Sequence, residues 1–481
     1  ATVDSATDNI LVTAATGGLT VDGNNAVSNA DGGNITLAAE GTAAADNLDI
    51  DSNVTATGGN GAINLYSTDT TDIDAAVTVS ATGTGAILVS AGSNYNNAAL
   101  LDGISAGDVV MQDGSTIQSV DGNITIQAPD DIQVSIVNAN SNGDTTRGQV
   151  IIHADYAGPD STGTSLYASD ADGAITDNLT AEGVNVTGGD MVISAGTGIG
   201  DGVAPNTDDL DISAIRLAAT TDSGDIHLQN TNIGNLTVGW VNPLTVTGIS
   251  IADASAGGDD SGNDDITLRA SARIVVSAAV VNNDGGDIIL AAESAVSNEA
   301  VDLDIDANIT ALGGTGAISL YSADDIDFDP SVTVSAESTG TILVSGGTDF
   351  NDGTPTARRV ESDINMQDGS EINSDDGNIT LITQRNIALS IVDANDDILT
   401  PDTTYGDVVI TADSNGDNDG EITENLTGET ANITAGTLAL RAGDGIGSAE
   451  DIDTDVLLLA AANSITTGAS NIQIDDVTAN T

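Results

Sequence analysis

The chain has 481 residues, with 55 Gly, no Cys and only 2% aromatic residues. This composition argues against ordinary globular domains, whose cores contain more aromatic side chains, and the lack of Cys excludes disulfide bonds. The formal net charge of −66, from 74 acidic and 8 basic residues, repels nucleic acids and anionic membrane surfaces and attracts cations.

The first residues, ATVDSATDNI, contain neither Met nor a signal sequence, so we expect a processed form or a piece of a longer chain. After them, short runs rich in Val, Ile and Thr alternate apolar and polar side chains, as in GNITL (33–37) and VTVS (77–80). This period of two predicts β-strands, and it argues against the disorder that few aromatics and a high charge would favour. No window carries a helical period. No segment approaches 18 consecutive apolar residues, so we expect no membrane insertion.

Paired aspartates stand out in the first hundred residues. Asp49 and Asp51 flank one Ile, and Asp72 and Asp74 flank another Ile further along the chain. Alternate residues of a strand face the same way, so each Ile is expected to point into the core and each Asp away from it.

A Gly or Asp followed by two alternate apolar residues recurs at fairly regular intervals, first at Gly33, Gly61, Gly85, Asp108, Gly122 and Gly148. Propeller blades need about 40–50 residues and aromatic signatures, and sandwiches need larger core residues. Turns of about 24 residues instead predict an all-β parallel β-helix (β-solenoid) with two or three strands per coil. Gly and Asn suit its corners, where we expect positive φ angles. About 20 coils spaced by ~4.8 Å would make a single elongated rod roughly 95 Å long.

The second half of the chain repeats the first. For example, DGGNITLAAE (31–40) returns as DGGDIILAAE (284–293). We therefore expect two tandem long repeats, residues 1–253 and 254–481, within one continuous β-solenoid.

The second copy also repeats the paired aspartates, as Asp304, Asp306, Asp327 and Asp329. If a coil has about 23–24 residues, each later pair lies directly above the earlier one, and each copy carries a square of four carboxylates. We expect no Arg near either square, and the chain contains no Lys. Calcium prefers oxygen ligands and can bridge carboxylates of adjacent coils, so the eight aspartates are candidate Ca2+ ligands. A solvated acidic face without a specific ion is the alternative.

We expect no enzymatic activity. His153 and His227 align with Thr411 and Gln473 of the second copy, so neither belongs to a repeated site. Aspartate doublets could supply acid and base for glycoside cleavage, but an Asp-rich chain contains such doublets by composition. A Lys-free chain of this charge is also poorly suited to bind polyuronate. A polysaccharide-binding or polysaccharide-cleaving β-helix is therefore the alternative function.

N-x-T triplets begin at Asn34, Asn53, Asn123, Asn178, Asn185, Asn235, Asn308, Asn378, Asn425 and Asn432. Strand alternation favours Asn and Thr as the outward neighbours of an inward apolar residue. Glycan attachment on a secreted surface is the alternative.

The chain resembles the giant β-helical exoproteins of bacteria, the filamentous-haemagglutinin-like adhesins. The resemblance rests on SAGTGIGDGVAPNTDDLDISAIRLAATTDSGDIHLQNT (194–231), on its echo RAGDGIGSAEDIDTDVLLLAA (441–461), and on the GNITL-type turns. It implies adhesion, or the building of an extracellular fibre or matrix.

Together these features predict a structural rod of an extracellular or cell-surface filament, adhesin or biofilm matrix, braced by Ca2+. The alternative for so acidic a chain is a halophile surface-coat protein without specific metal sites. The two ends of the chain have nearly matching phases, and unpaired strand edges drive association. The expected partners are therefore copies of the chain stacked end to end, or further repeats of a longer chain, and also cell-surface glycans.

Overall fold

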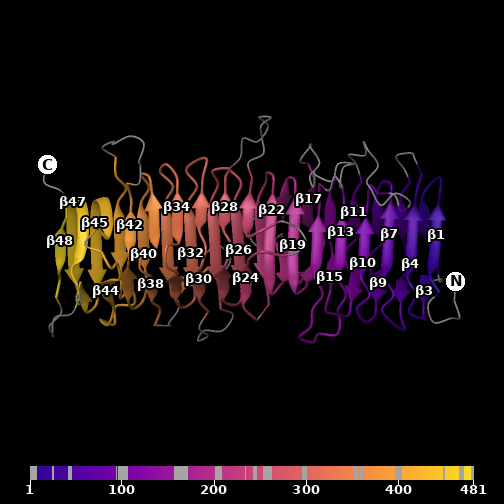
Figure 1. Cartoon of the computed structure of the whole chain (residues 1–481), viewed down its shortest axis with the longest axis horizontal. Coiled ribbons are helices and arrows are strands. Elements are labelled where there is room, and N and C mark those ends of the chain that lie inside the picture. The colour runs from indigo at the N-terminus through magenta and orange to yellow at the C-terminus, as the bar shows by residue number, and fades with distance from the viewer. Residues whose placement is uncertain are drawn as a thin grey trace. The chain divides into compact units, whose positions relative to one another are not determined.

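The computed structural model describes residues 8–23, 27–41, 46–93, 95, 107–155, 172–181, 183–200, 209–232, 234–241, 246–252, 263–294, 301–350, 356–357, 361–395, 404–428, 430–447, 450–464 and 471–477. Short β-strands make up all of the regular secondary structure in these residues (Figure 1). Two compact units are formed, one by Ala1–Thr231 with Trp240–Val246 and one by Asn232–Gly239 with Thr247–Thr481.

Strands of the first unit stack in parallel, and nearly every strand pairs with the third strand after it, so each coil contributes three strands. The first stack consists of β1 (Ile10–Ala14), β4 (Ile35–Ala39), β7 (Ile63–Ser67), β10 (Ile87–Ser90), β13 (Ile124–Gln127), β16 (Val150–His153), β19 (Asp190–Ala195) and β22 (Arg216–Thr221). The second stack consists of β2 (Leu19–Val21), β5 (Leu48–Ile50), β8 (Thr71–Ile73), β11 (Val109–Met111), β14 (Ile132–Val134), β17 (Ala174–Asp177) and β20 (Gly198–Ile199). The third stack consists of β3 (Val27–Asn29), β6 (Val54–Ala56), β9 (Thr78–Ala81), β12 (Thr116–Ser119), β15 (Ile136–Asn138), β18 (Val186–Thr187) and β21 (Leu210–Ser213). Both β20 and β21 then pair with β23 (Ile226–Asn230).

The second unit repeats this plan. Its first stack consists of β26 (Ile266–Ala270), β29 (Ile288–Ala292), β32 (Ile318–Ser322), β35 (Ile342–Gly346), β40 (Ile379–Ile382), β43 (Val408–Thr411), β45 (Ile433–Ala442) and β47 (Ile452–Asn463). The second stack consists of β24 (Leu236–Val238), β27 (Ile274–Val276), β30 (Leu303–Ile305), β33 (Ile326–Phe328), β38 (Ile364–Met366), β41 (Ile387–Leu389), β44 (Glu421–Glu424) and β46 (Gly445–Ile446). The third stack consists of β25 (Ile249–Ile251), β28 (Val280–Asn282), β31 (Ile309–Ala311), β34 (Thr333–Ala336), β39 (Glu371–Ser374) and β42 (Ile391–Asp393), and it continues into β45, β47 and β48 (Ile474–Asp476). A separate antiparallel pair joins β36 (Thr348–Asp349) to β37 (Thr356–Ala357).

This arrangement is a parallel β-helix, or β-solenoid, as the sequence predicts. The coil length varies more than expected, because Leu48 pairs with Thr71 at close to the expected interval, whereas Thr71 pairs with Val109 after a much longer one. Longer coils carry inserted loops and reduce the number of coils that a chain of this length can form. The described residues place eight strands in the first stack of each unit.

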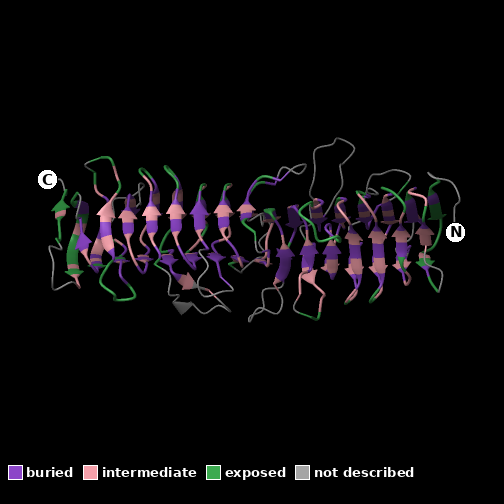
Figure 2. Cartoon of the chain, turned by 90° about the horizontal axis from the view of Figure 1, so that it is seen from below, coloured by how far each residue is buried: buried purple, intermediate pink, exposed green. Residues whose placement is uncertain are grey.

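Aliphatic side chains of successive coils stack in register and form the core. Ile35, Ile63, Ile87 and Ile124 stack on one another, and each is at most 1% exposed. Figure 2 shows the resulting alternation of buried and half-buried positions along the strands. Each such side chain contributes about 1.5–3 kcal/mol by leaving water, so small coils without aromatic residues still have a continuous core.

The glycines before the strands are required by close contact between coils rather than by backbone conformation. A Cβ atom on Gly61 would overlap the carbonyl oxygen of Gly33, and one on Gly85 would overlap that of Gly61. Positive φ angles occur instead at preceding corner residues such as Gly32 and Gly58. Positive φ is therefore found at the corners, as the sequence predicts, and not at the Gly that begins each strand.

Candidate metal centre

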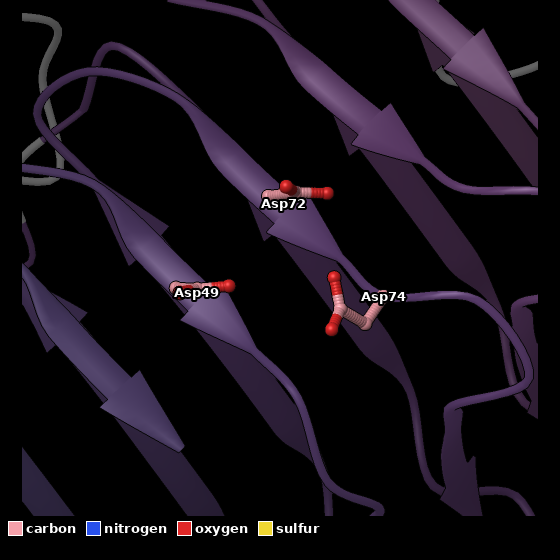
Figure 3. A group of neighbouring side chains, drawn as sticks. All are labelled: Asp49, Asp72 and Asp74. Carbon is pink, nitrogen blue, oxygen red and sulfur yellow. The ribbon is translucent and has the colours of Figure 1, made fainter. Parts of the chain in front are cut away.

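The first acidic square is built on two neighbouring strands of the second stack. In β5 and β8, Asp49 lies opposite Asp72, and Ile50 lies opposite Ile73. Both Ile side chains are completely buried, so the period of two leaves the aspartates on the other face of the strands. Figure 3 shows the Asp49 and Asp72 side chains on adjacent strands, with Asp74 just past the end of β8. The register predicted from the spacing of the two aspartate pairs is confirmed.

Four carboxylates meet in this square. One oxygen from each of Asp49, Asp72 and Asp74 lies within 4.8 Å of the others, and Asp51 interacts directly with Asp49. Burial and the three neighbouring carboxylates raise the pKa of Asp49 to about 6, and burial also raises the pKa of Asp72. Among the described residues, none of the four is in an ion pair. Like charges at this distance destabilise the folded chain until a cation or protons neutralise them.

A glutamine of the next coil, Gln112, also borders the square. The sequence does not predict this contact. The Nε2 amide of Gln112 donates to both carboxylate oxygens of Asp72, at 3.1 and 3.2 Å, and to Oδ1 of Asp74, at 2.8 Å. This amide orients two of the carboxylates without neutralising their charge.

The second copy has the same register, because Asp304 lies opposite Asp327 in β30 and β33. Its electrostatics differ from our expectation that no basic side chain is near. Arg273 forms an ion pair with Oδ2 of Asp304, and it also counteracts the rise in the pKa values of Asp306 and Asp327. The expectation failed because Arg273 lies just before β27, in the coil before β30. The coil from β27 to β30 is longer than the regular period, so a fixed period does not place Arg273 beside Asp304.

In the first copy the corresponding residue is Gly18. It lies just before β2, and β2 pairs with β5 in the same register as β27 pairs with β30. The first square is therefore purely acidic, whereas the second is partly neutralised. On the following coil, the side-chain amides of Asn365 and Gln367 donate to Asp327 and Asp329 at 3.3 and 3.1 Å.

Among the described residues, the groups of closely spaced carboxylates include three aspartates of the first square and none of the second. Besides Asp49, Asp72 and Asp74, four further triads have oxygens within 4.8 Å of one another: Asp108, Asp130 and Asp131; Asp302, Asp324 and Asp325; Asp413, Asp417 and Asp419; and Asp451, Asp453 and Asp475. On the two coils of the second square, the triad within this distance thus stands before strands β30 and β33, not at the four predicted positions. The alternation in DLDID (302–306) and DIDFD (325–329) contains this signal.

The donor set of the first square fits calcium. Ca2+ takes six to eight oxygen ligands at 2.3–2.6 Å, so two ligands on opposite sides of one ion are about 4.8 Å apart. The spacing of Asp49, Asp72 and Asp74 lies within this limit. Mg2+ needs a tighter octahedron at 2.0–2.1 Å. Asp49, Asp51, Asp72 and Asp74 would hold the ion, and it would replace their repulsion by attraction between two coils.

The N-x-T asparagines join coils through hydrogen bonds. Oδ1 of Asn34 accepts the backbone N–H of Ala62 at 2.8 Å, and Asn53, Asn123, Asn308 and Asn378 do the same for the next coil. Asn185 and Asn432 are completely buried. These asparagines therefore have a structural role. The predicted outward placement is wrong for Asn185 and Asn432, whose side chains are buried and bond to backbone groups of other coils.

The two histidines lie apart from the acidic square. His153 is 4% exposed, and burial lowers its pKa to about 4, so it is neutral at physiological pH. His227 lies beside Asp225, with Nε2 3.5 Å from Oδ2.

Within the described residues, no helix is long and apolar enough to cross a membrane.

No protein-family model matches the sequence, and no curated protein or solved structure matches the chain.

Proposed function

We propose that the chain is a structural, non-enzymatic protein whose solenoid coils are braced by Ca2+ and which forms part of an extracellular filament, adhesin or surface matrix. The observation that supports this most directly is the first square. Three of its carboxylates lie within 4.8 Å of one another, come from two coils, and have no ion pair among the described residues.

A specific ion explains this square better than a solvated acidic face does. A solvated face keeps its charges apart, whereas here the register of two strands fixes Asp49 against Asp72. Burial, and then the neighbouring carboxylates, raise the pKa of Asp49, which reflects the cost of a charge held there without a cation. Binding a divalent cation to the folded chain alone removes the cost and adds stability according to the ion concentration.

A cell-surface or extracellular location follows from the expected affinity. A half-buried square with few ligands is comparable with weak calcium sites of extracellular modules, whose dissociation constants are about 10⁻⁴–10⁻³ M. Such sites fill only in a medium rich in calcium. The charge of −66 also keeps the chain soluble there and concentrates cations around it.

Association with a second copy is the partner interaction that we propose. In β47, residues 456–463 pair with β45 on one side and have no strand partner on the other among the described residues. Leu457 and Leu458 of this strand are 75% and 63% exposed. An unpaired apolar strand edge promotes strand addition, and we propose that a second copy, or a further repeat of a longer chain, covers it.

Thermal unfolding followed by circular dichroism tests the calcium bracing. In millimolar Ca2+ we expect a melting temperature several degrees above that in a chelator, with little effect of Mg2+. Electron microscopy of both samples would show whether the assemblies also need the ion. If NaCl alone restores the stability lost on chelation, the chain is an acidic coat protein without specific sites. If the protein releases reducing ends from a polysaccharide, it is an enzyme and the structural role is wrong.

A further inference from the structure

A second kind of carboxylate cluster lies one position before the acidic square of the second copy. Asp302 precedes β30 and Asp325 precedes β33, so the pairing of these strands places the two residues on adjacent coils. The backbone N–H of Asp325 donates to the Asp302 carboxylate, and the N–H of Asp363 donates to Oδ1 of Asp325 at 2.7 Å. These two aspartates thus also connect successive coils.

The third carboxylate of the cluster, Asp324, is buried without a donor. The residue is 8% exposed. Its carboxylate accepts no hydrogen bond and forms no ion pair among the described residues, and instead faces Asp302 and Asp325 with oxygens within 4.8 Å. A largely buried carboxylate that faces two others is unfavourable until a cation or protons neutralise it.

Two basic side chains act on the cluster, and both form ion pairs elsewhere. Arg273 counteracts the rise in the pKa of Asp302 and pairs with Asp304. Arg385 donates to both oxygens of Asp363, with Nε 3.0 Å from Oδ1, and its Nη1 donates to Glu361 at 3.0 Å. It reduces the repulsion at Asp324 only at a distance.

We propose that Asp302, Asp324 and Asp325 form a divalent-cation site of the calcium type, distinct from the eight aspartates of the two squares. All three ligands are carboxylates, which are the hard oxygen donors that Ca2+ prefers. Their oxygens lie within 4.8 Å of one another, a separation that one Ca2+ ion can span. The site extends the bracing proposed above to a second pair of positions on the same two coils.

The two copies differ at this site, which provides a matched control. In the first copy, Asn47, Asp69 and Thr70 occupy the places of Asp302, Asp324 and Asp325. Only one carboxylate is present there. The first copy is therefore expected to hold no ion at this position, although its strands have the same register.

Equilibrium dialysis with Ca2+ alone tests the site in the full chain. Asp324→Asn should lose one equivalent of bound calcium, or bind it at least tenfold more weakly, whereas the matched Asp69→Asn should bind as the unmodified chain does. Asp72→Asn should remove a different equivalent, so failure of the first square and failure of this site are distinguishable. Unchanged calcium binding by Asp324→Asn would overturn the proposal.

A gain-of-site variant tests the proposal without replacing the buried Asp324. Asn47→Asp together with Thr70→Asp builds the triad around Asp69 in the first copy. One additional equivalent of calcium is expected, and it should disappear when Asp69→Asn is added. Unchanged stoichiometry in the double variant would contradict the assignment, provided that circular dichroism shows the unmodified strand content.

Discussion

Arg273 forms an ion pair with Asp304, and Gly18 stands at the corresponding place opposite the first acidic square. The same register of aspartates is thus partly neutralised by a side chain in one copy and has no such counter-charge in the other. The side chain of Arg273 is 41% exposed and that of Asp304 is 11% exposed, so the pair lies between a surface pair and a buried one.

The first prediction concerns this ion pair. Arg273→Gln should lower the free energy of unfolding by about 1–2 kcal/mol in a chelator, because it leaves a largely buried carboxylate without its partner. In millimolar Ca2+ the loss should shrink, since the second square then resembles the first. Arg216→Gln is the control, because Arg216 and Asp190 form an exposed pair at 3.3 Å that contributes less than about 1 kcal/mol. Equal losses for the two variants in urea unfolding would contradict this account.

The second prediction is a change of sign at the first square. In a chelator, Asp72→Asn should stabilise the chain by roughly 0.2–1 kcal/mol, because it removes like-charge contacts across the strand pair. In calcium the same variant should be less stable than the unmodified chain, because it lacks a ligand. Glu371→Gln removes the same charge where the neighbours in register are Thr333 and Ile391, and should show no inversion. Melting temperatures in both buffers are sufficient. Destabilisation by Asp72→Asn in both would show that the square is not a cation site.

The third prediction concerns pH in the absence of divalent ions. Asp49 faces Asp51, Asp72 and Asp74, and its pKa of about 6 in the folded chain lies above the ordinary value of 3.8. Folding therefore takes up protons between these values. The contribution to stability is fully present below about pH 4 and is lost as the pH rises through 6. Melting temperatures in a chelator should rise from pH 7.5 to pH 5. Asp49→Asn should reduce that rise without abolishing it, because the pKa values of Asp324, Asp325 and Asp419 are also raised, to about 7, 6 and 6. A steady fall on acidification would refute the assigned pKa.

Much of this geometry could be predicted from sequence, because two periods determine it. The alternation of side chains gives the inward residues, and the regular coil length places Asp49 against Asp72. Both hold because no insertion separates β5 from β8.

Where coils are longer, a regular coil length does not predict which residues meet. An inserted loop separates Gln112 from Asp74, and Arg273 precedes Asp304 by more than one regular coil. A fixed period places neither beside the aspartates it contacts. The triad around Asp324 was missed for another reason: the alternation places Asp302 and Asp325 on adjacent coils but does not show that Asp324 is buried against them.

The fourth prediction concerns the asparagines between coils. Oδ1 of the buried Asn185 accepts the N–H of Asp211 at 2.9 Å, and its Nδ2 donates to the Ser135 carbonyl oxygen at 3.3 Å. Asn185→Ala should cost about 2–3 kcal/mol, because it leaves buried backbone groups unsatisfied. Asn34→Ala, at an exposed corner with water available, should cost about 0.5–1.5 kcal/mol. Urea unfolding measures both. Equal costs would mean that burial does not govern the strength of these links.

The fifth prediction concerns the edge of β47. Leu458→Asp should prevent self-association, because a charge at an exposed edge strand opposes the addition of another strand. The side chain is 63% exposed, so folding should be little affected. Val409→Asp is the matched control, since Val409 is 40% exposed on β43, which pairs with strands on both sides.

Sedimentation velocity over a range of concentrations distinguishes the outcomes. We expect the unmodified chain and Val409→Asp to associate, and Leu458→Asp to associate at least tenfold more weakly. An unmodified chain that stays monomeric at all concentrations would show that a second copy is not what covers this edge. Association of Leu458→Asp as strong as that of the control would place the contact elsewhere. Because calcium acts within the coils and the edge lies at β47, chelation should lower the melting temperature even where Leu458→Asp has abolished assembly.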